Sequence, residues 1–192
     1  GIHTDAQRER WLTVLDEWTG DPGRALDVGC GTGFVALLLA ELGHEVVGVD
    51  AAPAMLDKAR DKSPQADRSL PVLQGDAETL PLADNSVGLV TARHLVWTLP
   101  SPRVALREWQ RVLEPGGQLL LIEGYWDHPE PWAEYERIHD ELPLYDGRPP
   151  EALCDVCQAE GLRAVESEPL QDPTLWGREP RHEYYLLTSN VS

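Results

Sequence analysis

Apolar residues along this chain follow two alternating patterns, short runs rich in Val and Leu and longer segments with helical spacing. The short runs predict strands at residues 25–28, 45–49, 70–73, 87–92, 118–123, 162–168 and 183–188. Apolar positions three or four residues apart predict helices at residues 5–18, 34–42, 53–62, 102–113, 131–142 and 150–160. Regular alternation of this kind indicates an α/β fold with a mostly parallel sheet.

Length and charge narrow the class of protein. The chain has 192 residues, 33 acids against 16 bases, and a net charge of −17. We expect one domain, residues 1–192, large enough for a core and a deep pocket. The negative balance disfavours nucleic acid and anionic membranes as partners, because both would repel it. No export signal or spanning segment is recognised, so a cytoplasmic monomer or homodimer is expected.

The cysteines agree with that expectation. Cys30, Cys154 and Cys157 are too few, and odd in number, for a disulfide framework. The last two form a single C-x-x-C in a helical segment, and we interpret this pair as helix packing. No bound metal is expected.

The strongest local signal is DVGCGTG at residues 27–33, between a predicted strand and a predicted helix. Glycines there permit a sharp turn and let a ligand approach backbone N–H groups at a helix N-terminus. Two acids follow in the order typical of doubly wound sheets. Asp50 ends the second strand, where it can accept ribose hydroxyls, and Asp76 follows the third, where it can accept an adenine amino group.

The glycine spacing discriminates between two adenine cofactors. A dinucleotide fingerprint, G-x-G-x-x-G counted from Gly29 and Gly31, requires a glycine where this chain has Phe34. Asp27 precedes the turn, and an acid there would repel a pyrophosphate but attract an ammonium and a sulfonium. The segment therefore favours S-adenosylmethionine over a nicotinamide dinucleotide.

With these residues in order, the sequence resembles the class I S-adenosylmethionine-dependent methyltransferases, in the small-molecule group that includes ubiquinone-biosynthesis-like enzymes (methyltransferase type 11). The resemblance covers about residues 12–123 and rests on ALDVGCGTG at 25–33, VVGVDAAPAML at 46–56, GDAETLPLADNSVGLV at 75–90 and REWQRVLEPGGQLLLIE at 107–123. It implies a Rossmann-like doubly wound seven-stranded sheet of order 3-2-1-4-5-7-6 with strand 7 antiparallel. It also implies that an N-terminal helix at 3–19 covers the pocket and that an acceptor-side insertion spans about 124–150.

The resemblance further implies roles for individual residues. Asp27 and the glycine turn would hold the methionine moiety, Asp50 would hold the ribose, and Glu78 would help to shape the loop beside the adenine. Arg93 and His94 would follow strand four beside the sulfonium. The expected cofactor contacts are Asp27, Gly29, Cys30, Gly31, Gly33, Asp50, Ala51, Met55, Asp76, Ala77, Glu78 and Arg93.

Methyl transfer from a sulfonium is a direct displacement, which needs alignment, exclusion of water and, for some acceptors, removal of a proton. His94 and His139 are the candidate catalytic bases, the second on the predicted insertion helix. Arg93 is expected to pair with an acid or the cofactor carboxylate, or alternatively to orient an acceptor carboxylate. His3 is expected at the surface.

Seven tryptophans, many for this length, suggest a pocket with aromatic walls. We interpret Trp18, Trp109 and Trp176 as structural. The expected acceptor contacts are Trp11, Trp97, Trp126, Trp132 and Tyr135.

These features predict methyl transfer to an O, S or N atom of a small, partly apolar or aromatic metabolite. Residues 91–97, TARHLVW, lack the Asn/Asp-Pro-Pro-aromatic segment of DNA and protein amide methylating relatives, which argues against nucleobase amines. The negative charge favours a neutral or cationic acceptor, with Arg93 as the one nearby residue that could admit a carboxylate. Two alternatives remain open: an NAD-dependent oxidoreductase, and an S-adenosylmethionine-binding protein without methyl transfer.

Overall fold

The computed structural model describes residues 2–62, 70–126, 133 and 135–191. Its strands form one seven-stranded sheet in the order β3-β2-β1-β4-β5-β7-β6. β7 pairs antiparallel with β5 and β6, and the other pairs are parallel. This confirms the predicted topology. The strands are β1 (Arg24–Val28), β2 (Glu45–Asp50), β3 (Val72–Gln74), β4 (Val87–Arg93), β5 (Leu113–Tyr125), β6 (Arg163–Pro169) and β7 (Glu183–Asn190).

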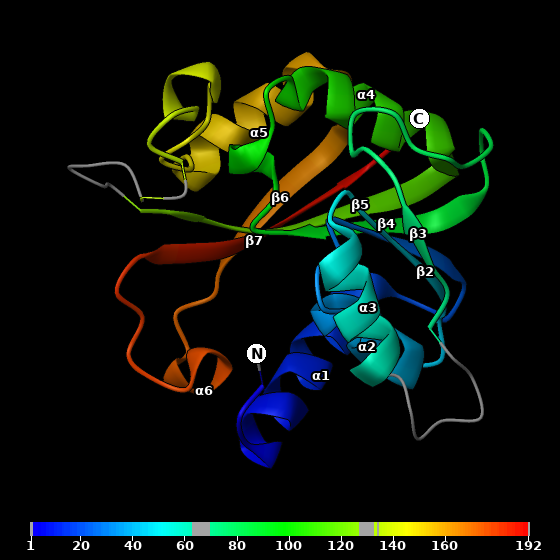
Figure 1. Cartoon of the computed structure of the whole chain (residues 1–192), viewed down its shortest axis with the longest axis vertical. Helices are drawn as coiled ribbons and strands as arrows, with labels where there is room; N and C mark the ends of the chain where they lie inside the picture. Colours follow the sequence, from blue (N-terminus) through cyan, green and yellow to red (C-terminus); the bar gives the residue numbers. More distant parts are fainter. Residues whose placement is uncertain (1, 63–69, 127–132, 134, 192) are drawn as a thin grey trace.

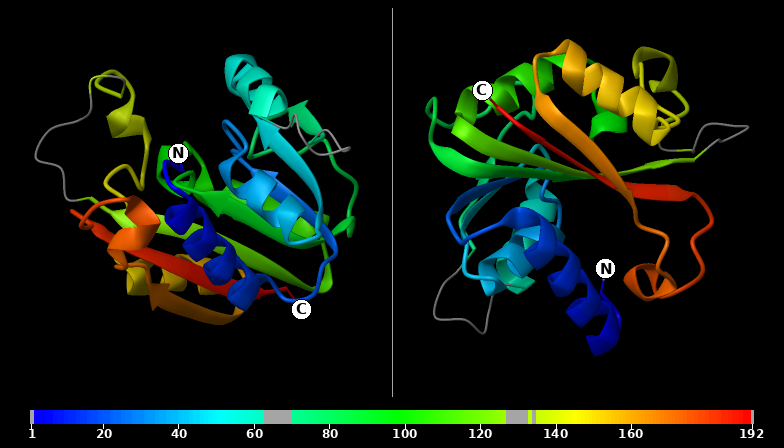
Figure 2. Two further views of the ribbon diagram at one scale, coloured as in Figure 1. Left: turned by 90° about the horizontal axis from the view of Figure 1, so that it is seen from below. Right: turned by 180° about the vertical axis from the view of Figure 1, so that it is seen from behind.

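Helices cover both faces of the sheet (Figures 1 and 2). One face carries α1 (Asp5–Thr19), α2 (Phe34–Glu41), α3 (Pro53–Lys62) and the short α6 (Pro173–Trp176). The other carries α4 (Pro102–Val112) and α5 (Pro150–Ala159). Within the described part of the chain, no helix is both long and apolar enough to cross a membrane.

Each face of the sheet has its own hydrophobic core. On the α4 and α5 face, Trp109 and Leu106 are fully buried against the central strands, and Cys157 joins them from α5. On the opposite face, Trp11, Leu15 and Leu39 pack from α1 and α2. Because both faces are covered, every residue of β1 after Arg24 is buried, and Asp27 is the one polar side chain among them. Cys157 thus packs as the sequence indicated.

Most boundaries fall within two residues of the predicted ones, and two elements differ more. β5 begins at Leu113, five residues before the predicted start, because the Pro-Gly-Gly turn continues into the strand with an irregular register opposite β4. α6 was not predicted, since a single turn of four residues carries no periodic signal. Asp172 caps it by accepting a hydrogen bond from the Thr174 N–H at 2.8 Å.

The helix predicted at residues 131–142 is wrong over the part of it that the structure describes. There the chain makes successive turns and one 3₁₀ turn, His139–Glu141. Leu142 and Tyr145 are buried against Trp97 and Trp126, and Tyr135 packs beside them. A helix would present one stripe of side chains, whereas this segment folds around the cluster, so tertiary packing overrides the helical spacing.

Gly147 fixes this insertion to the sheet. Its φ is 75°, and an added Cβ would lie 2.0 Å from the backbone oxygen of Gly124 on β5. We expect Gly147→Ala to lower the free energy of unfolding by about 2 kcal/mol or more, through left-handed strain plus a backbone overlap. Urea unfolding measures the change.

The matched control is Gly116→Ala, which has a similar φ of 78° but open space around its Cβ. It should lose only about 1 kcal/mol, the strain alone. Equal losses for the two variants would contradict the close approach at Gly147.

Candidate functional site

The glycine-rich turn between β1 and α2 adopts backbone angles that favour glycine. Gly29 and Gly31 have φ angles of 63° and 53°. A Cβ at Gly29 would lie 2.7 Å from the Leu95 side chain, whereas one at Gly31 would meet only a backbone oxygen at 4.0 Å. The turn is therefore closely packed at its first glycine and open at its second, where a ligand can approach the backbone.

Asp50, at the end of β2, holds this turn in place. Its Oδ2 accepts a hydrogen bond from the Gly31 N–H at 2.8 Å, and its Oδ1 accepts one from the Ala52 N–H at 2.8 Å. Each carboxylate oxygen can accept a second hydrogen bond. The partly exposed carboxylate is thus fixed by backbone and still able to accept hydroxyl groups.

Asp27, near the end of β1, is a buried acid beside the same turn. It is 2% exposed, and it accepts hydrogen bonds from the Thr91 hydroxyl at 2.9 Å and the Ala36 N–H at 3.1 Å. Burial raises the pKa of Asp27 to about 7, although these two hydrogen bonds and the charge of Arg93 act in the opposite direction. A cationic group placed nearby would favour its charged form.

Arg93, the last residue of β4, supplies the nearest cation. Its Cζ lies 4.4 Å from the ring centroid of Phe34 and 5.6 and 5.7 Å from those of Trp11 and Trp176. Its Nε is buried and has no hydrogen-bond partner among the described residues. Burial lowers the pKa of Arg93 to about 10, against the attraction of Asp27 and Glu123, so the guanidinium stays charged at neutral pH.

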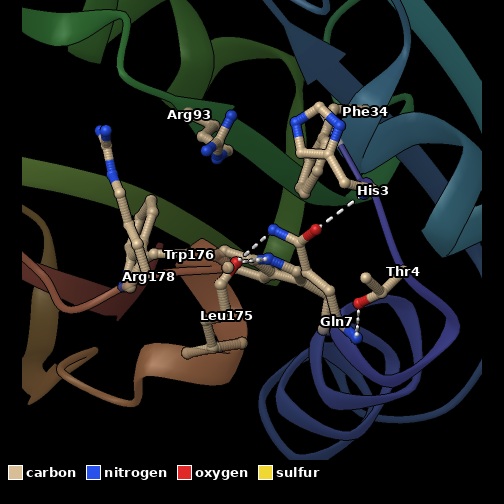
Figure 3. A pocket seen from close by; sticks show the side chains of 10 residues that line it. His3, Thr4, Gln7, Phe34, Arg93, Leu175, Trp176 and Arg178 are labelled. Carbon is tan, nitrogen blue, oxygen red and sulfur yellow. Dashed lines mark hydrogen bonds between the residues drawn. The ribbon is translucent and has the colours of Figure 1, made fainter.

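Two cavities meet at Phe34 and Arg93. The smaller, of about 210 Å³, follows the glycine turn and also includes Asp27. The larger, of about 470 Å³, lies between α1 and α6 (Figure 3). The larger cavity is lined by His3, Thr4, Gln7, Trp11, Phe34, Arg93, Leu175, Trp176, Gly177 and Arg178.

Residues 26–121 match the methyltransferase domain family. That match takes in the glycine turn, Asp50 and the whole of β4. The chain belongs to the class I S-adenosylmethionine-dependent methyltransferases. The sheet order agrees, as does the position of both cavities near the carboxyl ends of β1 and β4.

The methyltransferase is similar to an uncharacterized methyltransferase of Mycobacterium tuberculosis, with 42% identity over 126 residues, 66% of this chain and 49% of the relative. The chain spans about half the length of such curated relatives. Among solved structures, it resembles the [4+2]-cyclase SpnF with a TM-score of 0.74 and 23% identity, covering 95% of this chain and 81% of that one. It also resembles phosphoethanolamine N-methyltransferase 2 of Haemonchus contortus, solved with S-adenosylhomocysteine, with a TM-score of 0.72 and 16% identity over 95% and 52% of the two chains. These two likenesses show the fold.

The predicted adenine contacts of this methyltransferase lie after β2 and β3, outside both cavities. Met55 is 40% exposed at the start of α3, and Asp76 is exposed. The Ala77 carbonyl accepts a hydrogen bond from the Trp109 indole at 2.9 Å. Glu78 accepts the Ser101 N–H at 2.6 Å, so its carboxylate joins the loop after β3 to the start of α4. Ala51 is exposed between Asp50 and α3.

Three of the predicted acceptor contacts, Trp97, Trp126 and Tyr135, lie in a separate aromatic cluster. Trp97 and Trp126 are buried with their ring centroids 5.6 Å apart, and Tyr135 packs against Trp97 at 5.0 Å. Neither tryptophan lines either cavity, and no described residue of the insertion does. Trp132 lies outside the described residues. Of the predicted acceptor contacts that are described, only Trp11 lines the larger cavity.

The two candidate bases also lie apart from the cavities. His94 has a left-handed φ of 52° and lies among aromatic rings. Its ring centroid is 5.3 Å from that of Trp126 and 5.8 Å from that of Trp176. Burial, with the nearby Arg93, holds the pKa of His94 well below its usual range, so its ring is neutral at physiological pH. Its Nδ1 is buried, and no residue in the described part of the chain forms a hydrogen bond with it. His139 lies in the insertion, with its ring centroid 5.9 Å from that of Tyr145, and it lines neither of the two cavities.

Sequence reasoning missed much of the larger cavity. Trp176, interpreted as structural, lines it, and Arg178 and Leu175 come with it from the region of α6. His3 is exposed, as expected, but at the cavity mouth. A helix of one turn has no periodic pattern. The only sequence signal for α6 is Gly177 after Trp176, a glycine that can end a helix in the left-handed conformation.

Glu123 positions the turn after β4. It is 2% exposed, and its Oε1 accepts the N–H groups of Leu95 and Val96 at 3.0 and 2.9 Å. Leu95 is the residue that packs against Gly29, so this carboxyl connects β5 to the glycine turn. Burial raises the pKa of Glu123 to about 7.

Because the folded-state pKa of Glu123 lies above its ordinary value, the folded protein binds more protons than the unfolded chain between about pH 4.5 and 7. Its ionisation therefore destabilises the fold as the pH rises through that range. Glutamine keeps one acceptor oxygen and does not ionise. We therefore expect the free energy of unfolding of Glu123→Gln to rise relative to that of the wild type when the pH is raised from 5 to 8. Urea unfolding at both pH values measures this.

Glu123→Ala serves as the comparison, since it removes both accepted hydrogen bonds and leaves two buried N–H groups unpaired. It should lose about 2–4 kcal/mol at pH 5. A relative stability of Glu123→Gln that stays constant with pH would contradict the raised pKa.

Proposed function

We propose that this chain binds S-adenosylmethionine and transfers its methyl group to an O, S or N atom of a small, partly apolar acceptor in the larger cavity. The observation that carries the proposal is the pairing of Asp50 with the open Gly31 beside the buried Asp27. The glycine turn therefore has beside it a carboxylate that can accept hydrogen bonds from hydroxyl groups and a second acid that can carry negative charge. It suits a ribose and a cation, and it disfavours the pyrophosphate of a dinucleotide.

The residues present fit the cofactor. A Cβ at Gly31 would project into open space, and Asp27 is a buried acid whose charge a cation would stabilise. Asp50 would accept the ribose hydroxyls, and Met55 would cover the adenine. When bound, S-adenosylmethionine supplies a methyl group activated by its sulfonium.

The chain's own part in the transfer is positioning and exclusion of water. Phe34, Trp11 and Trp176 surround the Arg93 guanidinium where the two cavities meet, which makes the junction aromatic and poorly solvated. Alignment of two reactants at such a junction can supply a large part of the barrier reduction. His94 packs beside Trp176 as a neutral imidazole and lines neither cavity, so its proposed role as a base requires a rearrangement of the rings around it.

The first test separates cofactor binding from other ligands. S-Adenosylhomocysteine at about 100 times its Kd should raise the melting temperature by about 5–10 °C, and NADH should leave it unchanged. Asp50→Ala should weaken S-adenosylmethionine binding about 100-fold, through loss of charge-assisted hydrogen bonds. Asp16→Ala, an exposed acid on α1, is the matched control and should bind normally.

Turnover is tested by incubating S-adenosylmethionine with a library of small metabolites and measuring S-adenosylhomocysteine. Product that forms with an acceptor, and is lost in Asp50→Ala, supports methyl transfer. Stabilisation by NADH instead would overturn the proposal. Binding of S-adenosylmethionine without product across the library would favour a binding protein that does not transfer methyl groups.

A second prediction uses the raised pKa of Asp27. Since a cationic ligand favours the charged carboxylate, binding below about pH 7 must displace a proton. The affinity for S-adenosylmethionine should therefore fall as the pH drops from 8 to 5.5, with proton release visible by calorimetry in buffers of different ionisation enthalpy.

Asp27→Asn should bind more weakly at pH 8 and show no such slope. Asp50→Asn, which also removes an acid from the cradle, should weaken binding and keep the slope. A slope that persists in Asp27→Asn would assign the titration to another group.

A further inference from the structure

We infer that the larger cavity selects an acceptor that carries an anionic group, a carboxylate or an equivalent anion, held by Arg93 and Arg178. The inference rests on the proposed function, since it names the class of acceptor for that same site. It also reverses the expectation of a neutral or cationic acceptor drawn from the net charge of −17.

The charges that line the larger cavity are all of one sign. Arg93 and Arg178 are both lining residues, His3 lies at the mouth, and none of the described residues that line it is an acid. No salt bridge joins either arginine to an acid within the described residues. In a chain with twice as many acids as bases, a cavity with this lining marks a preference for negative charge.

Gln7, Thr4 and the indoles of Trp11 and Trp176 already make hydrogen bonds within the protein. Gln7 donates from Nε2 to the Leu175 carbonyl at 2.9 Å and accepts the His3 N–H at 2.8 Å (Figure 3). The Trp11 indole donates to that same carbonyl at 2.8 Å, and the Thr4 hydroxyl oxygen accepts the Gln7 N–H at 3.1 Å. The guanidinium groups are therefore the strongest donors left for a ligand.

The two arginines occupy different depths. Arg93 is partly buried among aromatic rings, with an unpartnered Nε, where a charge-assisted hydrogen bond is strong. Arg178 is exposed at the mouth, just after α6. An acceptor with an apolar body and an anionic end would pack its body on Trp11 and Trp176 and place its charge between the two guanidiniums.

Arg93 alone could equally hold the carboxylate of the cofactor, because it borders both cavities. Arg178 distinguishes an anion of the acceptor from the carboxylate of the cofactor, since it lines only the larger cavity. If the anion belongs to the acceptor, Arg178 affects acceptor binding and leaves S-adenosylhomocysteine binding unchanged.

The experiment uses the whole chain saturated with S-adenosylhomocysteine. The probes are matched sets that differ in one group: indole-3-acetate, its amide and tryptamine, and phenylacetate, its amide and phenethylamine. Isothermal titration measures each Kd. We expect at least one acid to bind about tenfold more tightly than its amide and its amine, and that preference to shrink as salt is raised.

The variants locate the preference. Arg178→Gln should reduce the preference for the acid about tenfold with the Kd for S-adenosylhomocysteine unchanged. Arg24→Gln, an exposed arginine at the start of β1 that pairs with Glu114, is the matched control and should alter neither. Arg178→Lys should retain part of the preference, because it keeps the charge but not the planar fork.

Three results would overturn the inference: amides or amines that bind as tightly as the acids, no binding of any acid while S-adenosylhomocysteine binds, or a preference unaffected by Arg178→Gln. If Arg178→Gln weakens S-adenosylhomocysteine itself, the anion is the cofactor's and the inference also fails. Failure of the proposed function is distinct, because it appears as absent S-adenosylhomocysteine binding in the wild type before any probe is added.

Discussion

One partly buried cation organises the carboxyl edge of this sheet. Arg93 ends β4, and the neighbouring strands β1 and β5 each contribute a buried acid there, Asp27 and Glu123. A lone buried charge is unfavourable by several kcal/mol, about as much as the whole stability of many domains. The three groups offset one another only in part, as the raised pKa values of both acids and the lowered pKa of Arg93 indicate. The face of Phe34 covers the guanidinium where no acid reaches it.

This arrangement determines the geometry on both sides of Arg93. Asp27 accepts an N–H from the first turn of α2, which sets where the glycine turn ends. Glu123 accepts two N–H groups from the residues after His94, which places Leu95 against Gly29. The left-handed His94 follows from that constraint, since the chain must reverse directly after β4 for both N–H groups to face one oxygen. The same acids that stabilise the cation therefore also position the glycine turn that lines the smaller cavity.

The strands at this edge of the sheet could be predicted from the sequence, whereas the segments that cover the edge could not. Buried parallel strands are near-continuous apolar runs, so β1, β2 and β4 were predictable, and Asp50 followed from its place at a strand end. Spacing alone misassigned residues 131–142, because aromatic side chains there pack on Trp97 and Trp126 rather than along a helix. Arg178 and Arg93 are 85 positions apart and line one cavity only because the segment between β6 and β7 folds back over α1, and no local pattern encodes that placement.

The contrast between the net charge and the cavity charge has a physical basis. Mobile ions screen exposed charges beyond about 8–10 Å at physiological ionic strength, so acids scattered over the outer helices contribute little inside a cavity. Groups in a poorly solvated site interact over short range at lower effective dielectric, so the arginines that line the cavity have more effect there than the carboxylates on the outer helices. The net charge governs which molecules approach the protein, whereas the bonded state of each lining group governs which one stays. In the larger cavity, Gln7, Trp11 and Thr4 already make hydrogen bonds within the protein, whereas no described residue pairs with the Arg93 Nε, so selectivity resides in the charge.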